Sequence, residues 1–268
     1  MPNVLVCIKR VPGASGQVLL TADGMSVDTR HVGHTVNPHE ECAVEAAVQA
    51  VSAHGGAATV LTLGPSSALA QLREALAVGV GAGVHLDTGE ENSGDGYGPA
   101  DVAAAIADVA RARQAAGAGF DLLLLGNDAA DTGDFQVGVR LAYLLDVPVV
   151  TGIRSFTLEP SDDAPAGFLA RAVGDGPDGS EEFEVPLPAV LTIKEGEISP
   201  RYPSIPGRLK AKKAPVEVIA AAPPAQGTAR RRLVLPPERA SVVEVLGQGG
   251  EGAPAVVDVL EKIGVVQR

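Results

Sequence analysis

Short apolar runs alternate with helical patterns through the first 150 residues, and this alternation limits the possible folds more than any other feature. The runs are short and rich in Val, Leu and Ile, as are strands that are buried on both faces. Repeated strand–helix units predict a parallel sheet with right-handed crossovers and helices on both faces. We expect strands at 4–8, 59–63, 84–86 and 120–125, a hairpin at 17–28, and helices starting at 38, 66, 99 and 137.

Two helix starts carry clear capping signals. Asn37 precedes Pro38, and this pair is typical of a helix start because Asn accepts a hydrogen bond from a free N–H group and Pro suits the first turn. Ser66 is expected to cap the next helix in the same way.

The pattern changes after residue 150. Short runs joined by turns rich in Pro, Gly and Asp indicate antiparallel strands, and the run at 190–193 returns as one more strand. Residues 196–237 contain frequent prolines and no periodicity, so we interpret them as an arm that lies on a partner. The antiparallel strands are expected at 153–158, 168–173 and 183–185, a short last helix at 255–263, a first domain at 1–193 and an extended segment at 194–268.

Composition and charge exclude several classes of protein. Hydrophobic residues make up 46% of the chain but aromatic residues only 3%, which disfavours a chain that encloses a whole flavin by stacking. A net charge of −12 argues against binding to nucleic acid or to an anionic membrane. Basic residues nevertheless cluster in two places, which is consistent with either a docking surface or a solvated arm. The clusters are Arg201, Arg208, Lys210, Lys212 and Lys213, and then Arg230, Arg231 and Arg232.

Cysteine usage and hydropathy indicate the compartment. Cys7 and Cys42 are too few and too far apart for a disulfide framework or a metal site. No apolar run approaches the ~20 residues that cross a bilayer, and the first residues already form a strand pattern instead of a signal peptide. We therefore expect a soluble, cytoplasmic protein.

The segment 121–138 is the strongest candidate for a binding site. Its apolar strand runs into a loop of glycine and short polar residues, and a helix pattern follows. At such a junction in a parallel sheet, backbone N–H groups and the positive helix N-terminus bind phosphate. Asp128, Asp131 and Asp134 do not have the spacing of a calcium loop, so we predict no metal site.

Several motifs, in order along the chain, resemble the β subunit of electron-transfer flavoprotein, and the resemblance covers nearly the whole chain. Each motif is short, but their common order makes the match specific. The motifs are Ile8-Lys9-Arg10-Val11-Pro12, the helix start from Asn37 to Val48, Leu63-Gly64-Pro65, Ala75-Leu76-Ala77-Val78-Gly79, the loop 126–138, Pro200-Arg201-Tyr202, and Leu209-Lys210-Ala211-Lys212-Lys213.

The resemblance implies a Rossmann-like, three-layer α/β fold of the adenine nucleotide α-hydrolase-like type, with an antiparallel extension and an extended C-terminal arm. It implies a heterodimer that carries electrons from flavin dehydrogenases to a quinone reductase or another acceptor. The α subunit would hold most of the FAD and this subunit would hold AMP, so we expect an electron carrier without catalytic residues of its own.

Carried over by position, the resemblance implies two sets of residues. A nucleotide site would be formed by Cys7, Asn37, Pro38, His39, Glu40, Leu63, Gly126, Asn127, Asp128, Ala129, Asp131, Thr132, Gly133, Asp134, Phe135, Gln136 and Val137. Partner recognition would involve Glu197, Ile198, Arg201, Tyr202, Lys210, Lys212 and Lys213.

Three departures from the family pattern concern the flavin and the partner. Ala14 stands where the family has an aromatic neighbour of the flavin, and His39 replaces a Phe. His39 is interpreted either as a group that tunes the flavin or as a solvent-facing residue of the first helical turn. Glu197-Ile198-Ser199 replaces a Leu-Asn-Glu type of sequence, which leaves the dehydrogenase undefined.

Two alternatives stay open at this point. Gln136-Val137-Gly138 also resembles the bifurcating members, in which a second FAD replaces AMP. A stand-alone adenine-nucleotide hydrolase of the same superfold would act without a partner and turn over ATP.

Overall fold

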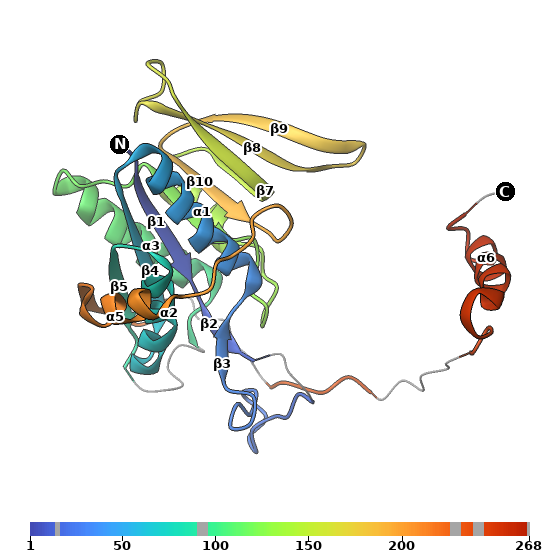
Figure 1. Cartoon of the computed structure of the whole chain (residues 1–268). Coiled ribbons are helices and arrows are strands. Elements are labelled where there is room, and N and C mark those ends of the chain that lie inside the picture. The colour runs from blue at the N-terminus through green and yellow to red at the C-terminus, as the bar shows by residue number, and fades with distance from the viewer. Residues whose placement is uncertain (14–16, 90–95, 226–231, 238–243, 267–268) are drawn as a thin grey trace. The chain divides into compact units, whose positions relative to one another are not determined.

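The computed structural model describes residues 1–13, 17–89, 96–225, 232–237 and 244–266. Two compact units are present, Met1–Leu233 and Val234–Arg268. The first contains a nine-stranded sheet of order β11-β5-β4-β1-β6-β10-β7-β8-β9 (Figure 1). Its parallel core consists of β1 (Asn3–Ile8), β4 (Ala57–Gly64), β5 (Ala82–Asp87), β6 (Leu122–Gly126) and β10 (Ala189–Ile193).

Two apolar clusters fill the space on either side of the sheet. Alternate residues of β1 enter different clusters: Val4 and Val6 pack toward α1 (Pro38–His54) and α2 (Leu69–Val78). Leu5 and Cys7 instead pack toward α3 (Pro99–Ala115) and α4 (Val137–Leu145). This period of two confirms the predicted three-layer α/β architecture, with a core built from Ala, Val and Leu.

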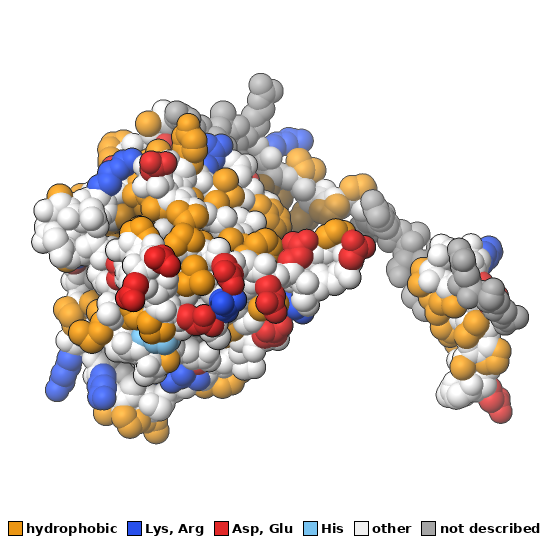
Figure 2. Space-filling view, turned by 90° about the horizontal axis from the view of Figure 1, so that it is seen from above, with side chains coloured by type: hydrophobic (Ala, Val, Ile, Leu, Met, Phe, Trp, Pro, Cys, Tyr) orange, Lys and Arg blue, Asp and Glu red, His pale blue; other side chains and the backbone are white. Residues whose placement is uncertain are grey.

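One strand, which has a parallel neighbour on one side and an antiparallel neighbour on the other, joins the antiparallel extension to the parallel core. β7 (Val149–Pro160) pairs parallel with β10 and antiparallel with β8 (Phe168–Gly176), which pairs in turn with β9 (Gly179–Pro186). β10 therefore returns from the extension to lie between β6 and β7. The strands predicted after residue 150 are confirmed, and β7 begins earlier than predicted. In Figure 2, Asp and Glu side chains gather across the middle of the face that is shown.

The prediction of an irregular arm over 196–237 is wrong for part of that segment. α5 (Ile205–Lys213) packs on α2, and β11 (Val216–Ala220) extends the sheet by parallel pairing with β5. Arg73 of α2 donates hydrogen bonds to the carbonyl oxygens of Ala211 and Ala214, which anchors the end of α5. Backbone pairing, Arg73, the buried Ala211 and a few partly buried residues such as Val216 and Ile219 hold this segment in place, and these contacts leave no regular hydrophobic period in the sequence.

Several smaller predictions are tested as well. Ser66 does not cap α2: a 3-10 turn, Ser66–Ala68, comes first, and Ala68 precedes the helix without a side-chain cap. The predicted hairpin is reduced to one antiparallel bridge between Leu20 and Val27. The short antiparallel pair β2 (Arg10–Pro12) and β3 (His34–Val36) was not predicted.

The second unit contains a 3-10 turn, Gly249–Gly252, and α6 (Ala253–Lys262), close to the helix predicted at 255–263. Val256, Val257 and Val259 of α6 are exposed within this unit. Such an apolar face on a short helix is typical of a segment that packs on another surface.

Candidate nucleotide-binding site

The carboxyl ends of β1 and β6 and the start of α1 meet at one edge of the sheet. The backbone N–H of Lys9, just after β1, donates to Glu40 Oε2 at 2.8 Å. At Gly126, the end of β6, an added Cβ would lie 2.7 Å from Glu40 Cγ. Glycine is therefore required where the strand passes the helix. The structure thus brings together Cys7, Glu40 and Gly126, which the sequence placed in one site.

The start of α1 also holds the loop that follows β6. Asn37 Oδ1 accepts from the backbone N–H of His39 at 2.8 Å, which confirms the predicted cap. Asn37 Nδ2 donates to the carbonyl oxygen of Asp128 at 2.5 Å, and His39 Nδ1 lies 2.6 Å from Asp128 Oδ1. His39 therefore faces the loop, and its ring is partly buried.

Burial governs the two ionisable groups beneath the loop. It raises the pKa of Glu40 from 4.5 to about 8, although the hydrogen bond from Lys9 and its positive charge act in the opposite direction. Burial, together with the nearby Glu40, also raises the pKa of the Cys7 thiol. Cys7 is therefore a buried thiol, and it packs with Leu63 in the cluster under α3.

The loop itself combines internal turns with exposed side chains. The N–H groups of Thr132 and Gly133 donate to the carbonyl oxygen of Ala129 at 3.2 and 2.8 Å. Gly133 has φ 59°, and Phe135 has φ 53°, which is rare for a bulky residue. Asp131, Thr132, Asp134, Phe135 and Gln136 are exposed.

Asn127 ties the beginning of this loop to the centre of the sheet. Its N–H donates to the carbonyl oxygen of Ile193 at 2.8 Å, and its Oδ1 accepts from Thr192 Oγ1 at 2.7 Å. Thr192 Oγ1 in turn accepts from the N–H of Gly152 at 3.0 Å. The loop therefore starts from a fixed point on β10.

The N-terminus of α4 closes the loop. Gln136 occupies the cap position, but its side chain makes no capping hydrogen bond, and its Oε1 accepts from Arg140 at 2.9 and 3.0 Å. Gly138 is buried against β10, where an added Cβ would lie 2.4 Å from Thr192 Cγ2. An uncapped helix N-terminus beside exposed loop residues is suited to an anion.

The residues predicted to recognise a partner divide into two groups. Glu197, Ile198 and Arg201 make contacts within the chain: Ser155 Oγ donates to Glu197 Oε2 at 2.5 Å, and Arg201 pairs with Glu45. Tyr202 is 96% exposed, and Lys210, Lys212 and Lys213 lie on the last turn of α5.

Sequence reasoning missed three residues that belong with these groups. Glu45 is buried on α1, and Ile205 and Leu209 are exposed, one turn apart on α5. The spacing of Ile205 and Leu209 was available in the sequence, whereas the burial of Glu45 was not. Ala14, Arg230 and Arg231 lie outside the described residues.

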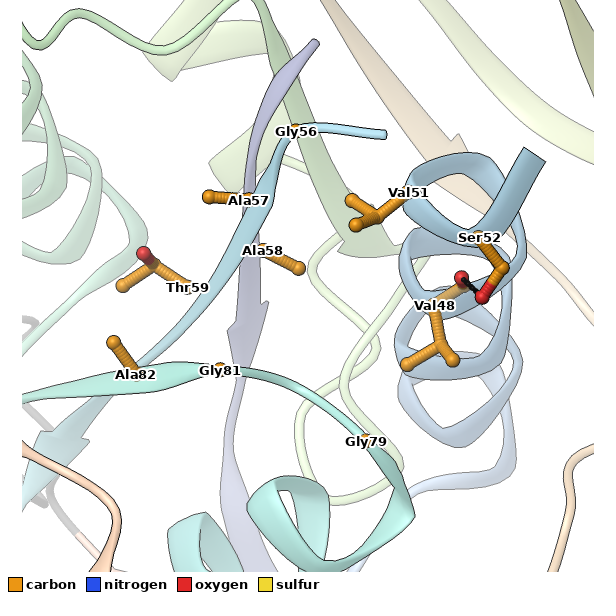
Figure 3. A pocket seen from close by; sticks show the side chains of 10 residues that line it. All are labelled: Val48, Val51, Ser52, Gly56, Ala57, Ala58, Thr59, Gly79, Gly81 and Ala82. Atoms are coloured by element: carbon orange, nitrogen blue, oxygen red, sulfur yellow. Dashed lines mark hydrogen bonds between the residues drawn. The ribbon is translucent and has the colours of Figure 1, made fainter. Parts of the chain in front are cut away.

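A separate pocket of about 390 Å³ lies at the opposite edge of the sheet (Figure 3). It is bounded by Val48, Val51 and Ser52 of α1, by the start of β4, and by the turn into β5. Its walls are mainly aliphatic, so it offers little to a phosphate. Among the described residues, no cluster of His, Cys, Asp or Glu is arranged to hold a metal ion, and no described helix could span a membrane.

Comparisons with known proteins identify the family of this chain. The model of the electron transfer flavoprotein domain matches residues 24–224. The chain belongs to the electron transfer flavoprotein β-subunit family. It is 33% identical to the β subunit of Bacillus subtilis over 218 residues, which is 81% of this chain and 78% of that protein. The β subunit of Syntrophomonas wolfei is 31% identical over 91% of this chain and 89% of its own length. The human β subunit is 32% identical over 81% and 80%.

Family membership confirms the predicted resemblance and assigns the chain to flavoprotein electron transport. The match includes α5 and β11, the segment in which the sequence had indicated no regular structure. The match therefore runs from β3 to β11.

Proposed function

We propose that this chain is the β subunit of a heterodimeric electron transfer flavoprotein, that it holds AMP at the carboxyl edge of the sheet, and that it shuttles electrons through an FAD held mainly by the α subunit. The observation that carries the AMP proposal is the uncapped N-terminus of α4 beside the exposed loop. The backbone N–H groups of Val137 and Gly138 would hold the phosphate without a P-loop lysine.

Charge in the loop is compatible with a nucleotide phosphate. The loop contains three aspartates, but Asp131 pairs with Lys9 at 2.7 Å and Asp128 lies against His39 at 2.6 Å. The charge of Lys9 reduces the repulsion that a phosphate would meet. Asn37, Pro38, Glu40, Cys7 and Leu63 would border the adenosine from the ends of α1, β1 and β4.

An FAD supplies the redox chemistry when bound, by accepting and returning electrons one at a time. This chain would close one side of that flavin and present a surface to a flavin dehydrogenase, with a quinone reductase or another acceptor downstream. We infer that it does so in the cytoplasm, as a carrier and not as an enzyme.

The parts of the chain after residue 193 would make the contacts with other proteins. α6 exposes Val256, Val257 and Val259, an apolar face that suits the α subunit. α5 exposes Ile205 and Leu209 beside Lys210, Lys212 and Lys213, which suits an acidic surface on a partner.

Co-expression with a gene for an electron transfer flavoprotein α subunit from the same genome tests this proposal. We expect the two chains to copurify and to release one FAD and one AMP, identified by mass spectrometry and an absorbance spectrum. Two FAD and no AMP would favour the bifurcating type, which the Gln136-Val137-Gly138 sequence resembles. A monomer that turns over ATP would contradict the proposal.

A further inference from the structure

Glu45 is a buried carboxylate that takes no part in the nucleotide site. It lies on α1 with 3% of its side chain exposed, and four hydrogen bonds reach it. Oε1 accepts from Gln49 Nε2 at 2.8 Å and from Arg201 Nη2 at 2.7 Å. Oε2 accepts from Arg201 Nε at 2.7 Å and from the backbone N–H of Arg201 at 3.3 Å. The acceptor sites of the carboxylate are thus filled.

The electrostatics of this pair favour the ionised acid. Burial by itself raises the pKa of Glu45, but the hydrogen bonds from Arg201 and Gln49 outweigh it and hold the pKa below its usual value. Paired, nearly parallel bonds from a guanidinium are also directional, so they fix the orientation of the arginine and not only its position.

A second contact from α1 holds the same segment of chain. Cys42 Sγ donates to the carbonyl oxygen of Ile198 at 3.3 Å. Cys42, Glu45 and Gln49 are spaced by three and four residues, so they lie on one face of α1. Residues 198–201 are therefore attached to α1 at both ends.

The attached segment leads directly to exposed side chains. Tyr202 follows Arg201 and is 96% exposed, and Ile205 at the start of α5 is 77% exposed. The conformation of the chain at Arg201 therefore sets the direction in which Tyr202 leaves the surface.

We propose that Glu45 is a positioning residue for partner docking: it fixes the backbone and guanidinium of Arg201, and through them the placement of Tyr202 against the dehydrogenase. The part of this inference that concerns the dehydrogenase rests on the proposed function. Arg201 thereby contributes to recognition through its contact with Glu45, while Tyr202 supplies the contact surface.

Replacing Glu45 and replacing Arg201 have different consequences for the residue that remains. Arg201 is about half exposed, with 49% of its side chain accessible, so water can solvate it when Glu45 is replaced. Replacing Arg201 instead leaves a buried carboxylate without its main partner, which destabilises the fold itself. Substitutions at Glu45 are therefore the cleaner test of positioning.

Hydrogen exchange in the purified heterodimer tests the inference without a dehydrogenase. In Glu45→Gln, we expect the backbone amide of Arg201, which donates to Glu45 Oε2 in the wild type, to exchange about tenfold faster, because the weakened contact makes local opening of this segment more frequent. Glu41→Gln, an exposed neighbour on the same helix, should leave that exchange unchanged. Equal exchange in the wild type and Glu45→Gln would overturn the inference.

Electron-transfer kinetics then test the functional consequence. With a purified flavin dehydrogenase that reduces the wild-type heterodimer, Glu45→Gln should raise KM for the heterodimer about tenfold while kcat changes by less than about twofold. Arg201→Lys keeps the charge but loses the paired geometry, so it should give an intermediate KM. A fall in kcat with unchanged KM would overturn the inference.

Cofactor analysis separates this inference from the proposed function. Both Glu45→Gln and Glu41→Gln should retain the nucleotide and flavin content of the wild type, because neither residue borders the loop. A wild-type heterodimer that holds no AMP, or that no flavin dehydrogenase reduces, would contradict the proposed function, while the exchange experiment would still decide the role of Glu45.

Discussion

Lys9 and Asp131 are 122 residues apart in the sequence, and their side chains form an ion pair that joins the end of β1 to the loop after β6. The Nζ–Oδ1 distance is 2.7 Å, and both side chains are partly exposed. A phosphate held by the N-terminus of α4 would compete with Asp131 for this lysine. In the proposed AMP complex, the pair would therefore link the charge of the nucleotide to the conformation of the loop.

Asp131→Asn is expected to strengthen AMP binding. Removing the carboxylate frees Lys9 for the phosphate, and we expect Kd to fall about three- to tenfold at low salt, as for a partly exposed ion pair. Calorimetric titration of the nucleotide-free heterodimer measures this. Asp134→Asn removes a charge from the same loop without touching Lys9, so an equal gain there would contradict a specific role for the pair.

Glu40→Gln is expected to flatten the dependence of stability on pH. The pKa of Glu40 is raised to about 8 in the folded state, so the folded protein binds this proton more tightly than the unfolded chain does. The protonated Glu40 therefore stabilises the fold fully below its ordinary pKa of 4.5, and this contribution is lost as pH rises through 8. Relative to the wild type, the variant should gain about 4 kcal/mol between about pH 5 and pH 9. Urea unfolding of the heterodimer measures the difference, with the exposed Glu182→Gln as control. Parallel pH profiles for wild type and Glu40→Gln would refute this expectation.

Asn37 is expected to contribute through two separable hydrogen bonds. Asn37→Ala removes both the cap of α1 and the bond to the carbonyl oxygen of Asp128, and should lower stability by about 1–2 kcal/mol. Asn37→Asp keeps the capping oxygen and loses only the donor to the loop. Thermal unfolding should therefore rank the aspartate variant between the wild type and the alanine variant. The loss of the hydrogen bond to the loop in the aspartate variant should appear mainly as weaker AMP binding.

The packing of Gly138 against Thr192 makes a rescue experiment possible. Gly138→Ala would place a Cβ 2.4 Å from Thr192 Cγ2, and we expect a loss of about 1–3 kcal/mol from overpacking. Thr192→Ser removes that methyl group and keeps the hydroxyl that bonds Asn127 and Gly152. The double variant should recover most of the stability in chemical denaturation. Additive losses would show that the contact is not the cause.

The parallel core and the loop were predictable because their signals are local. Apolar runs for β1, β4 and β6 and the Asn37-Pro38 cap are legible in a few neighbouring residues, and all four form as predicted. α5 and β11 were not predicted. α5 buries only Ala211, and β11 is held at the sheet edge by backbone pairing and by the partly buried Val216 and Ile219, so neither shows a regular apolar period.

The site shows the same division. Asn37, Glu40 and Gly126 lie at element ends, which the sequence marks, and the fold brings them together. The contacts of Lys9 and Thr192 join residues more than thirty positions apart, as does the pair of Glu45 with Arg201 outside the nucleotide site. Such long-range contacts leave no local spacing to detect.

The position of β10 has a consequence for synthesis of the protein. Because β10 fills the middle of the sheet between β6 and β7, a nascent chain that has emerged only as far as β9 has no central strand with which to join its two halves. The sheet can therefore close only after residues Ala189–Ile193 have left the ribosome, and until then the edge of β6 that pairs with β10 has no partner strand.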